Sequence, residues 1–468
     1  LGKLIYIFDD NNISIDGHVD KVSITDQKKK FESFGWQVLE VDGHNEIEIK
    51  NAIDLSKEET NKPSLIIAKS TIGKFAPNKQ NTSSIHGAPL GNEEMKLFFD
   101  EIGWEGDPFD HSDDVYDYFA EKRLEDNKSF EKWKSNLDNK LNNDRSFKKL
   151  WEQFEKNELS FPESFEIQEA ATRVTGGNYL KLIGLENKFV LGGSADLAAS
   201  TKQIISEESY TSENRHGQNI EFGIREHSMA AVVNGISLHS NLFSFGSTFL
   251  VFSDYMRPSI RLASLMNLNS AYIFTHDSIY LGEDGPTHQP VEHLMSLRLI
   301  PGLDVIRPSN SIETIYAYKY LFSNTKNPKV LSLTRQNLKF LDYDVDYSDF
   351  INGGFIISKG ADLTIFASGS EVNLALEIKE TLKEYSVQVV SVPILNKLTP
   401  KISESLNSNK LTFTIELGKA AGWSDYIGNI TESFSVQTFG KSAPENDLAE
   451  FFKVNAESIG KKIRNYLG

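Results

Sequence analysis

The chain has 468 residues, more than one hydrophobic core usually organises, so two or three domains are expected. The formal net charge of -17 argues against a nucleic-acid-binding protein, because such proteins carry a basic excess or stripe. Zero cysteines exclude disulfides and thiolate chemistry, and no apolar run reaches the roughly 18 residues of a membrane span. We therefore expect a cytoplasmic protein with neither a membrane nor a nucleic-acid partner.

The first part of the chain alternates apolar strands with helix-compatible stretches, which is typical of a parallel α/β domain. Its predicted strands and helix lie at 4–8, 36–41 and 64–69, and at 46–60. Residues 112–160 are dense in Asp, Glu, Lys and Asn, with apolar residues at helical spacing. They predict amphipathic helices that pack outside a domain and lead to a linker.

Two further α/β blocks follow. The second begins near Phe165, with strands predicted at 188–192, 271–275, 303–307 and 329–334, and a helix at 224–239. The third begins near Phe355, with strands predicted at 362–368, 387–392 and 411–416, and a helix at 371–385. We expect three α/β domains with mainly parallel sheets at 1–154, 155–345 and 346–468, the first of them incomplete.

The run from His276 to Pro290 concentrates polar side chains directly after a predicted strand. Ligands of parallel sheets bind at such strand ends. A histidine can shuttle a proton near neutral pH, and an aspartate can hold a hydroxyl group. A solvated loop explains any single histidine here equally well. His276 and His288 together, on either side of Asp284, favour a substrate site.

Glu226 and a nearby aromatic stretch form a second candidate. Glu226 lies in the first turn of a predicted helix, where the helix dipole favours a carboxylate without any further role. Burial would instead raise the pKa of a carboxyl group and let it share a proton with a heterocycle nitrogen. Phe249, Phe252 and Tyr255 recur every three residues, which predicts one face of a helix. Such a stripe usually packs in a core, and stacking on a flat ligand is its other use.

Cationic groups occur near several predicted strand ends. Arg binds phosphate oxygens with two donors at once, so a sugar phosphate would require such groups together. Each of them alone is more simply a surface residue. The group consists of Arg173, Ser200, His276 and Arg335.

The first block contributes two further motifs. Asn11 stands in the run from Asp9 to Ile13, directly after a predicted strand. Asp and Asn favour a turn there, and their oxygens also suit Mg²⁺. The run from His86 to Gly91 is either a plain loop or a loop that presents His86 to a ligand.

Taken in this order, the segments resemble the transketolase family, and the resemblance extends over nearly the whole chain. The run from Thr275 to Pro290 is the most specific part, and four others agree with it: 193–197, 225–226, 332–338 and 86–91. The resemblance implies a thiamine diphosphate-binding fold and an enzyme of the pentose phosphate pathway. Such an enzyme transfers a two-carbon ketol unit from a ketose phosphate to an aldose phosphate through a thiamine diphosphate carbanion. It also implies Mg²⁺, with Ca²⁺ or Mn²⁺ as alternatives.

The resemblance further implies a role for each matching residue. The catalytic residues would be Glu226, which protonates the aminopyrimidine, with His288, His86 and Asp284. The cofactor contacts would be Glu226, Phe249, Phe252, Tyr255, Ile72, Asn11 and His86. The substrate contacts would be Arg173, Ser200, His276, Asp284, His288, Arg335 and His86. The metal ligands would be the Asn11 side chain and the Ile13 backbone carbonyl. The active sites would lie between the subunits of a homodimer whose interface includes 224–239.

The chain departs from the family pattern in three places. Ala199 replaces a common Pro, and Ser83 replaces a His that some members have. The Gly-Asp-Gly motif that supplies a metal carboxylate would lie upstream of Leu1, so we expect this chain to be inactive without an upstream part. Dihydroxyacetone synthase and deoxyxylulose phosphate synthase are alternatives with the same cofactor. A non-catalytic binding protein that retains the fold is an alternative of another class.

Overall fold

The computed structural model describes residues 1–167, 169–341, 343–407 and 409–468. The chain divides into two compact units, 1–133 and 134–468, with the boundary inside helix α4 (Asp113–Asn143). Within the described ranges, every helix is too short or too polar to cross a membrane.

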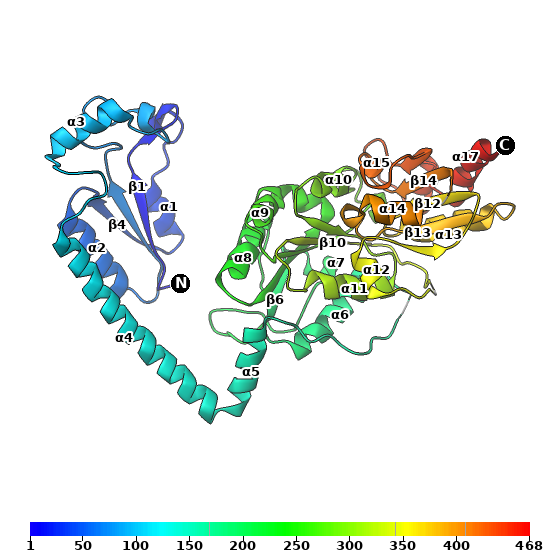
Figure 1. Cartoon of the computed structure of the whole chain (residues 1–468), viewed down its shortest axis with the longest axis horizontal. Coiled ribbons are helices and arrows are strands. Elements are labelled where there is room, and N and C mark those ends of the chain that lie inside the picture. Colours follow the sequence, from blue (N-terminus) through cyan, green and yellow to red (C-terminus); the bar gives the residue numbers. More distant parts are fainter. Residues whose placement is uncertain (168, 342, 408) are drawn as a thin grey trace. The chain divides into compact units, whose positions relative to one another are not determined.

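The first unit contains a three-stranded parallel sheet. Its strands lie in the order β1 (Ile5–Asp10), β5 (Ser64–Lys69) and β4 (Gln37–Asp42), beside α1 (Gln27–Ser33) and α2 (Glu46–Glu58) (Figure 1). In the register of the sheet, Asp10 and Asp42 both pair with Lys69. The residues that follow the three strands therefore lie along one edge. β1 ends two residues later than the predicted strand, and the chain turns at Asn12, which has φ 58°.

Three helices follow this sheet. They are α3 (Asn92–Ile102), α4 and α5 (Arg145–Lys156), so the helical prediction for 112–160 is confirmed. The predicted packing is confirmed only for α5, where the Phe154 ring lies 5.3 Å from that of Phe189. No side chain of α4 is buried within the chain, and Leu124 is 61% exposed. The apolar spacing of α4 thus predicted the helix, but the helix has no buried face.

The second unit begins with a five-stranded parallel sheet. The strand order is β6 (Val190–Ser194), β7 (Phe243–Phe249), β8 (Ala271–Thr275), β10 (Lys329–Leu333) and β9 (Asp304–Ile306). All but β7 were predicted from the sequence. Helices α6 (Thr172–Glu186) and α11 (Ser311–Leu321) cover one face, and α8 (Glu226–His239) and α9 (Ser253–Leu265) cover the other (Figure 1). Along β8, Ile273 joins the first core, whereas Tyr272 and Phe274 join the second.

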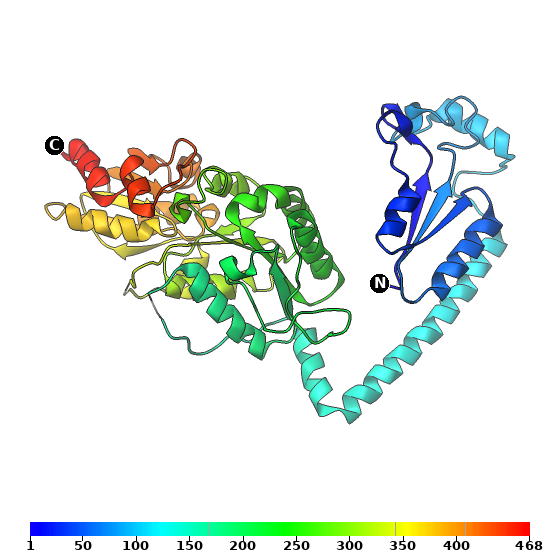
Figure 2. The same cartoon turned by 180° about the vertical axis from the view of Figure 1, so that it is seen from behind.

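A second sheet occupies the carboxy-terminal part of this unit. Its order is β11 (Phe355–Ser358), β13 (Val387–Ser391), β12 (Leu363–Ala367), β14 (Leu411–Glu416) and β15 (Glu432–Ser435). β11 is antiparallel to β13, and the other pairs in this sheet are parallel. Helices α13 (Glu371–Thr381) and α17 (Ala456–Leu467) lie side by side (Figure 2). The predicted α/β class with mainly parallel sheets is confirmed.

Short elements connect these layers. The short strands are β2 (Ile13–Ser14) and β3 (Gly17–His18). The short helices are α7 (Ala198–Thr201), α10 (His293–Arg298), α12 (Tyr347–Ile351), α14 (Pro400–Leu406), α15 (Trp423–Ile427) and α16 (Glu445–Phe451).

Candidate active site

The carboxyl edge of the β6–β10 sheet gathers most of the site residues predicted in the second unit. Phe249, the last residue of β7, pairs with Thr275, the last residue of β8. Thr275 in turn pairs with Leu333 at the end of β10. His276 and Arg335 follow these two strands directly or after one residue. The parallel register therefore brings together side chains that lie far apart in the sequence.

The three aromatic residues form a wall, but not one face of a helix as predicted. Phe249 ends β7, Phe252 lies in a 3-10 turn (Leu250–Phe252) and Tyr255 lies in the first turn of α9. The ring centroids of Phe249 and Phe252 are 6.0 Å apart with 7° between the planes, and those of Phe252 and Tyr255 are 5.9 Å apart with 26°. The three rings, spaced three residues apart in the sequence, still stack on one another because the chain turns sharply where the buried strand β7 ends.

His276 lies against this wall and is held by three neighbours. Its backbone has φ 60°, and its ring centroid is 3.7 Å from that of Phe249. Thr275 Oγ1 lies 2.8 Å from Nδ1, and Arg173 Nη1 lies 3.2 Å from Nε2. Burial, followed by the charges of Arg173, Arg335 and His288, lowers the pKa of His276 to about 3. The ring is therefore neutral near pH 7, with Nε2 accepting from Arg173 and Nδ1 donating to Thr275.

Arg173 is the centre of a positively charged group. It lies in the first turn of α6 and not directly after a strand in the sequence. Thr172 and Thr334 exchange hydrogen bonds of 3.0 and 2.7 Å that fix this turn to the end of β10, so Arg173 reaches a strand end in space. Its Nη1 donates to the Ser200 backbone carbonyl at 2.7 Å. Burial and the nearby Arg335 charge lower the pKa of Arg173. Within the described residues its buried Nε has no hydrogen-bond partner, so a donor is left over for an anion.

The loop after β8 contains two further predicted site residues, His288 and Asp284, which differ in their burial and in their contacts. His288 is partly buried, and its ring meets that of Phe252 edge-on, with centroids 5.6 Å apart. Thr287 Oγ1 lies 2.9 Å from its Nδ1. Asp284 is exposed, and its carboxylate makes no hydrogen bond or ion pair in the part of the chain that the structure describes. Asp277 of the same run is fully buried and bonds Arg307 at 2.8 Å, so it is a structural ion partner.

Glu226 is the first residue of α8, as the sequence predicts, and it is partly buried. Across the described ranges its carboxylate has no hydrogen bond or ion pair, so it is available to a donor from a ligand. Helix α8 packs along α9, the helix that contains Tyr255. An unpaired carboxylate and a wall of stacked rings suit a flat heterocycle with a basic nitrogen.

The first unit holds the remaining predicted residues at its own sheet edge. Asn11 follows β1, and its Oδ1 accepts from the Ile13 backbone N–H at 3.0 Å, which closes a tight turn at the end of the strand. Ile72 follows β5, and its carbonyl accepts from Asn81 N–H at 2.9 Å. His86 is exposed in the loop beyond. Sequence reasoning missed His44, which follows β4 and accepts from Thr71 N–H at 2.8 Å. The sequence held a sign of this, because His44 comes three residues after the strand predicted at 36–41.

Fold and site together define a thiamine diphosphate-dependent enzyme. Three family models match the chain: the transketolase thiamine diphosphate binding domain at 1–159, the transketolase pyrimidine binding domain at 168–340 and the transketolase-like C-terminal domain at 353–455. Curated transketolases of Bacillus subtilis and Staphylococcus aureus are each 38% identical over 99% of this chain and 73% of their own length.

Solved structures agree with these matches. Transketolase from Pichia stipitis, in complex with sedoheptulose 7-phosphate, superimposes with a TM-score of 0.93 at 30% identity, over 98% of this chain and 71% of that one. Transketolase from Campylobacter jejuni gives 0.89 at 33% identity, over 99% and 73%. The chain belongs to the transketolase family, and its reaction is the transfer of a two-carbon ketol unit between sugar phosphates.

Proposed function

We propose that the second unit holds the aminopyrimidine of thiamine diphosphate between Glu226 and the aromatic wall, with the sugar phosphate beside it. The observation that supports this most is the convergence of Arg173, His276 and Arg335 next to the ring of Phe249. A stacking surface and an anion site thus lie side by side, as a flat cofactor and a phosphorylated substrate require.

Each residue then has a definite task. The bound cofactor supplies the nucleophile that takes up and passes on the two-carbon unit. The Glu226 carboxylate shares a proton with a pyrimidine nitrogen, and the stacked rings orient that heterocycle. His288 holds or moves a proton at a sugar hydroxyl, and Asp284 accepts a hydrogen bond from another hydroxyl. His276 stays neutral and keeps Arg173 directed at the phosphate, which Arg335 and Ser200 also bind.

The first unit would hold the diphosphate and its metal. Mg²⁺ takes oxygen ligands and is often shared with phosphates. Its ligands here would be the Asn11 side-chain oxygen and the Ile13 backbone carbonyl, from two residues that one hydrogen bond holds in the same turn. Ile72 would contact the cofactor, and His86 would face both cofactor and substrate. Ca²⁺ or Mn²⁺ would suit the same oxygen ligands.

The donor is proposed to be a ketose phosphate and the acceptor an aldose phosphate. Solved Pichia stipitis transketolases are described as complexes with sedoheptulose 7-phosphate and, for one variant, fructose 6-phosphate. Transfer from xylulose 5-phosphate to ribose 5-phosphate, without turnover of pyruvate and glyceraldehyde 3-phosphate, would separate this function from deoxyxylulose phosphate synthase. Formaldehyde as the preferred acceptor would instead indicate dihydroxyacetone synthase.

Arg173→Met is expected to raise the KM for a ketose phosphate by about 10- to 100-fold, because a hydrogen bond to a charged group contributes about 1.5–3 kcal/mol. Transfer from erythrulose, a ketose without phosphate, should change far less. Steady-state kinetics of the native protein with both donors measure the difference. The control is Arg215→Met, since Arg215 is exposed and its Nη1 bonds Tyr210. An equal loss with both donors would contradict a phosphate contact.

We also propose that two copies form a homodimer through α8 and α9. Among the described residues these helices and their ends expose a group of large apolar side chains: Ile224, Val232, Leu238, Leu262, Leu265 and Met266. Such a surface is typical of obligate interfaces, which bury more than about 2,000 Å². In such a dimer each site would take its metal half from one subunit and its pyrimidine half from the other.

A subunit-exchange experiment tests this arrangement. Native protein with Glu226→Ala and native protein with Asn11→Ala are each expected to be inactive, and their mixture to recover activity. Random exchange makes half the dimers mixed, each with one intact site, so about a quarter of the wild-type sites should return. No recovery despite exchange would mean that each site lies within one chain.

A further inference from the structure

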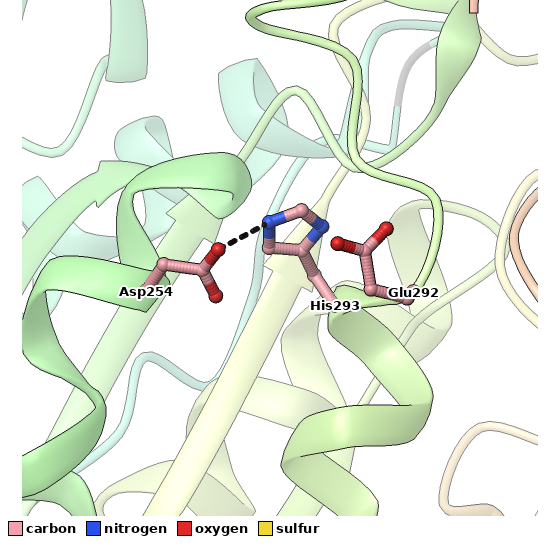
Figure 3. A group of neighbouring side chains, drawn as sticks. All are labelled: Asp254, Glu292 and His293. Carbon is pink, nitrogen blue, oxygen red and sulfur yellow. Dashed lines mark hydrogen bonds and ion pairs between the residues drawn. The ribbon is translucent and has the colours of Figure 1, made fainter. Parts of the chain in front are cut away.

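Beside the aromatic wall, three side chains have the composition of a metal site. Asp254, Glu292 and His293 each offer one ligand atom, and these atoms lie within 4.8 Å of one another. No other group of three or more His, Cys, Asp or Glu residues meets this condition in the described ranges. Asp254 is the second residue of α9, Glu292 caps α10 and His293 begins α10, so the group joins two helices (Figure 3).

His293 is the buried member of the group and is only 5% exposed. Its Nε2 lies 3.2 Å from Asp254 Oδ2. Figure 3 shows the ring between the two carboxylates, with the other ring nitrogen, Nδ1, on the side of Glu292. Nδ1 is buried and has no hydrogen-bond partner in the described part of the chain. A buried polar atom without a hydrogen-bond partner lowers the stability of the fold by about 1–3 kcal/mol, so a ligand that binds this nitrogen would be stabilising.

The lone pair of the imidazole and the two negative carboxylates repel one another, and a bound cation would remove this repulsion. A neutral imidazole has one N–H and one lone pair. When carboxylates lie on both sides of the ring, the lone pair must face one of them, and this contact is repulsive. A divalent metal that accepts the lone pair removes this repulsion, and its charge offsets the negative charge of the carboxylates. Asp254 and Glu292 are exposed in the single chain, so an ion can reach the group from solvent.

We propose that Asp254, Glu292 and His293 bind a divalent transition metal of the Zn²⁺ type. One imidazole nitrogen with two carboxylate oxygens is a mixed ligand set that suits Zn²⁺ better than Mg²⁺, which prefers oxygen alone. Three protein ligands leave a fourth, tetrahedral position for water. Because the ring lies between the two carboxylates, bonds of about 2.0–2.2 Å require one carboxylate to move to the side of the ring where the metal binds, which its exposure permits. The ion would fasten α9 to α10 next to Tyr255.

The test is titration of the chelator-treated full chain with Zn²⁺ by calorimetry, without thiamine diphosphate. The absorption bands of Co²⁺ serve as a second readout. We expect one equivalent of Zn²⁺ to bind, and its affinity to fall at least about 10-fold in both Glu292→Gln and His293→Gln. His216→Gln, which changes an exposed histidine outside the group, should bind Zn²⁺ like the wild type. Zn²⁺ should also raise the Tm of the wild type but not of Glu292→Gln.

Glu292 is exposed, so its amide variant keeps the test valid even if the change at buried His293 disturbs folding. Equal Zn²⁺ affinity in wild type and Glu292→Gln would overturn the proposal. The absence of Zn²⁺ binding at millimolar concentration would also overturn it.

Discussion

Glu226→Gln is expected to lower the rate of ketol transfer by about 10²- to 10⁴-fold, the usual contribution of a positioned proton-transfer group. The amide keeps the size of the side chain but cannot exchange a proton with the pyrimidine. Glu226 has no other partner among the described residues, so its loss should affect catalysis and cofactor binding rather than folding. Activity of the native protein and the affinity for thiamine diphosphate are the measurements.

The matched control is Glu46→Gln, because Glu46 is likewise the first residue of a helix, α2. If Glu226 only complements the helix dipole, both variants should lose about 0.3–1 kcal/mol of stability and keep their activity. A loss of transfer confined to Glu226→Gln supports the catalytic role. Wild-type transfer in that variant would exclude it.

Arg307→Met is expected to lower the free energy of unfolding of the second unit by about 3–5 kcal/mol, because it leaves buried carboxylates without their counter-charge. Arg307 is fully buried, with its Nε 2.8 Å from Asp277 Oδ2 and its Nη2 3.1 Å from Glu371 Oε1. Its Nη1 also donates to the Ser368 carbonyl at 2.7 Å. Burial raises the pKa of Glu371, and the Arg307 charge opposes that rise. These bonds join the two sheets of the unit and include Asp277, the residue that follows His276.

Urea unfolding, followed by a probe in the second unit, measures this loss. The control is Lys339→Met, which removes an exposed ion pair with Glu377 and should cost less than about 1 kcal/mol. A double variant, Arg307→Met with Glu371→Leu, should recover part of the stability because fewer buried charges are left unpaired. Equal losses in Arg307→Met and Lys339→Met would show that the buried network is not held by this arginine.

Much of the fold could be predicted because parallel strands buried on both faces appear locally as short apolar runs. β5, β8 and β14 lie within the bounds predicted for them. β7 was not predicted because its sequence, Phe-Ser-Phe-Gly-Ser-Thr-Phe, holds four small residues among its three Phe and so lacks a continuous apolar run, although every one of its residues is buried. Only the neighbouring strands β6 and β8 make this segment a central strand.

The sequence by itself determined the family, the order of the α/β elements and most of the candidate site residues, since these depend on local pattern and on motifs of neighbouring residues. Tertiary structure alone decided which of them meet. Arg173 and His276 are 103 positions apart and come together because α6 is fixed to the end of β10. The pairing of Asp254 with His293 likewise depends on how α9 and α10 pack. Contacts of this kind are set by strand order and helix packing, which no local stretch of sequence encodes.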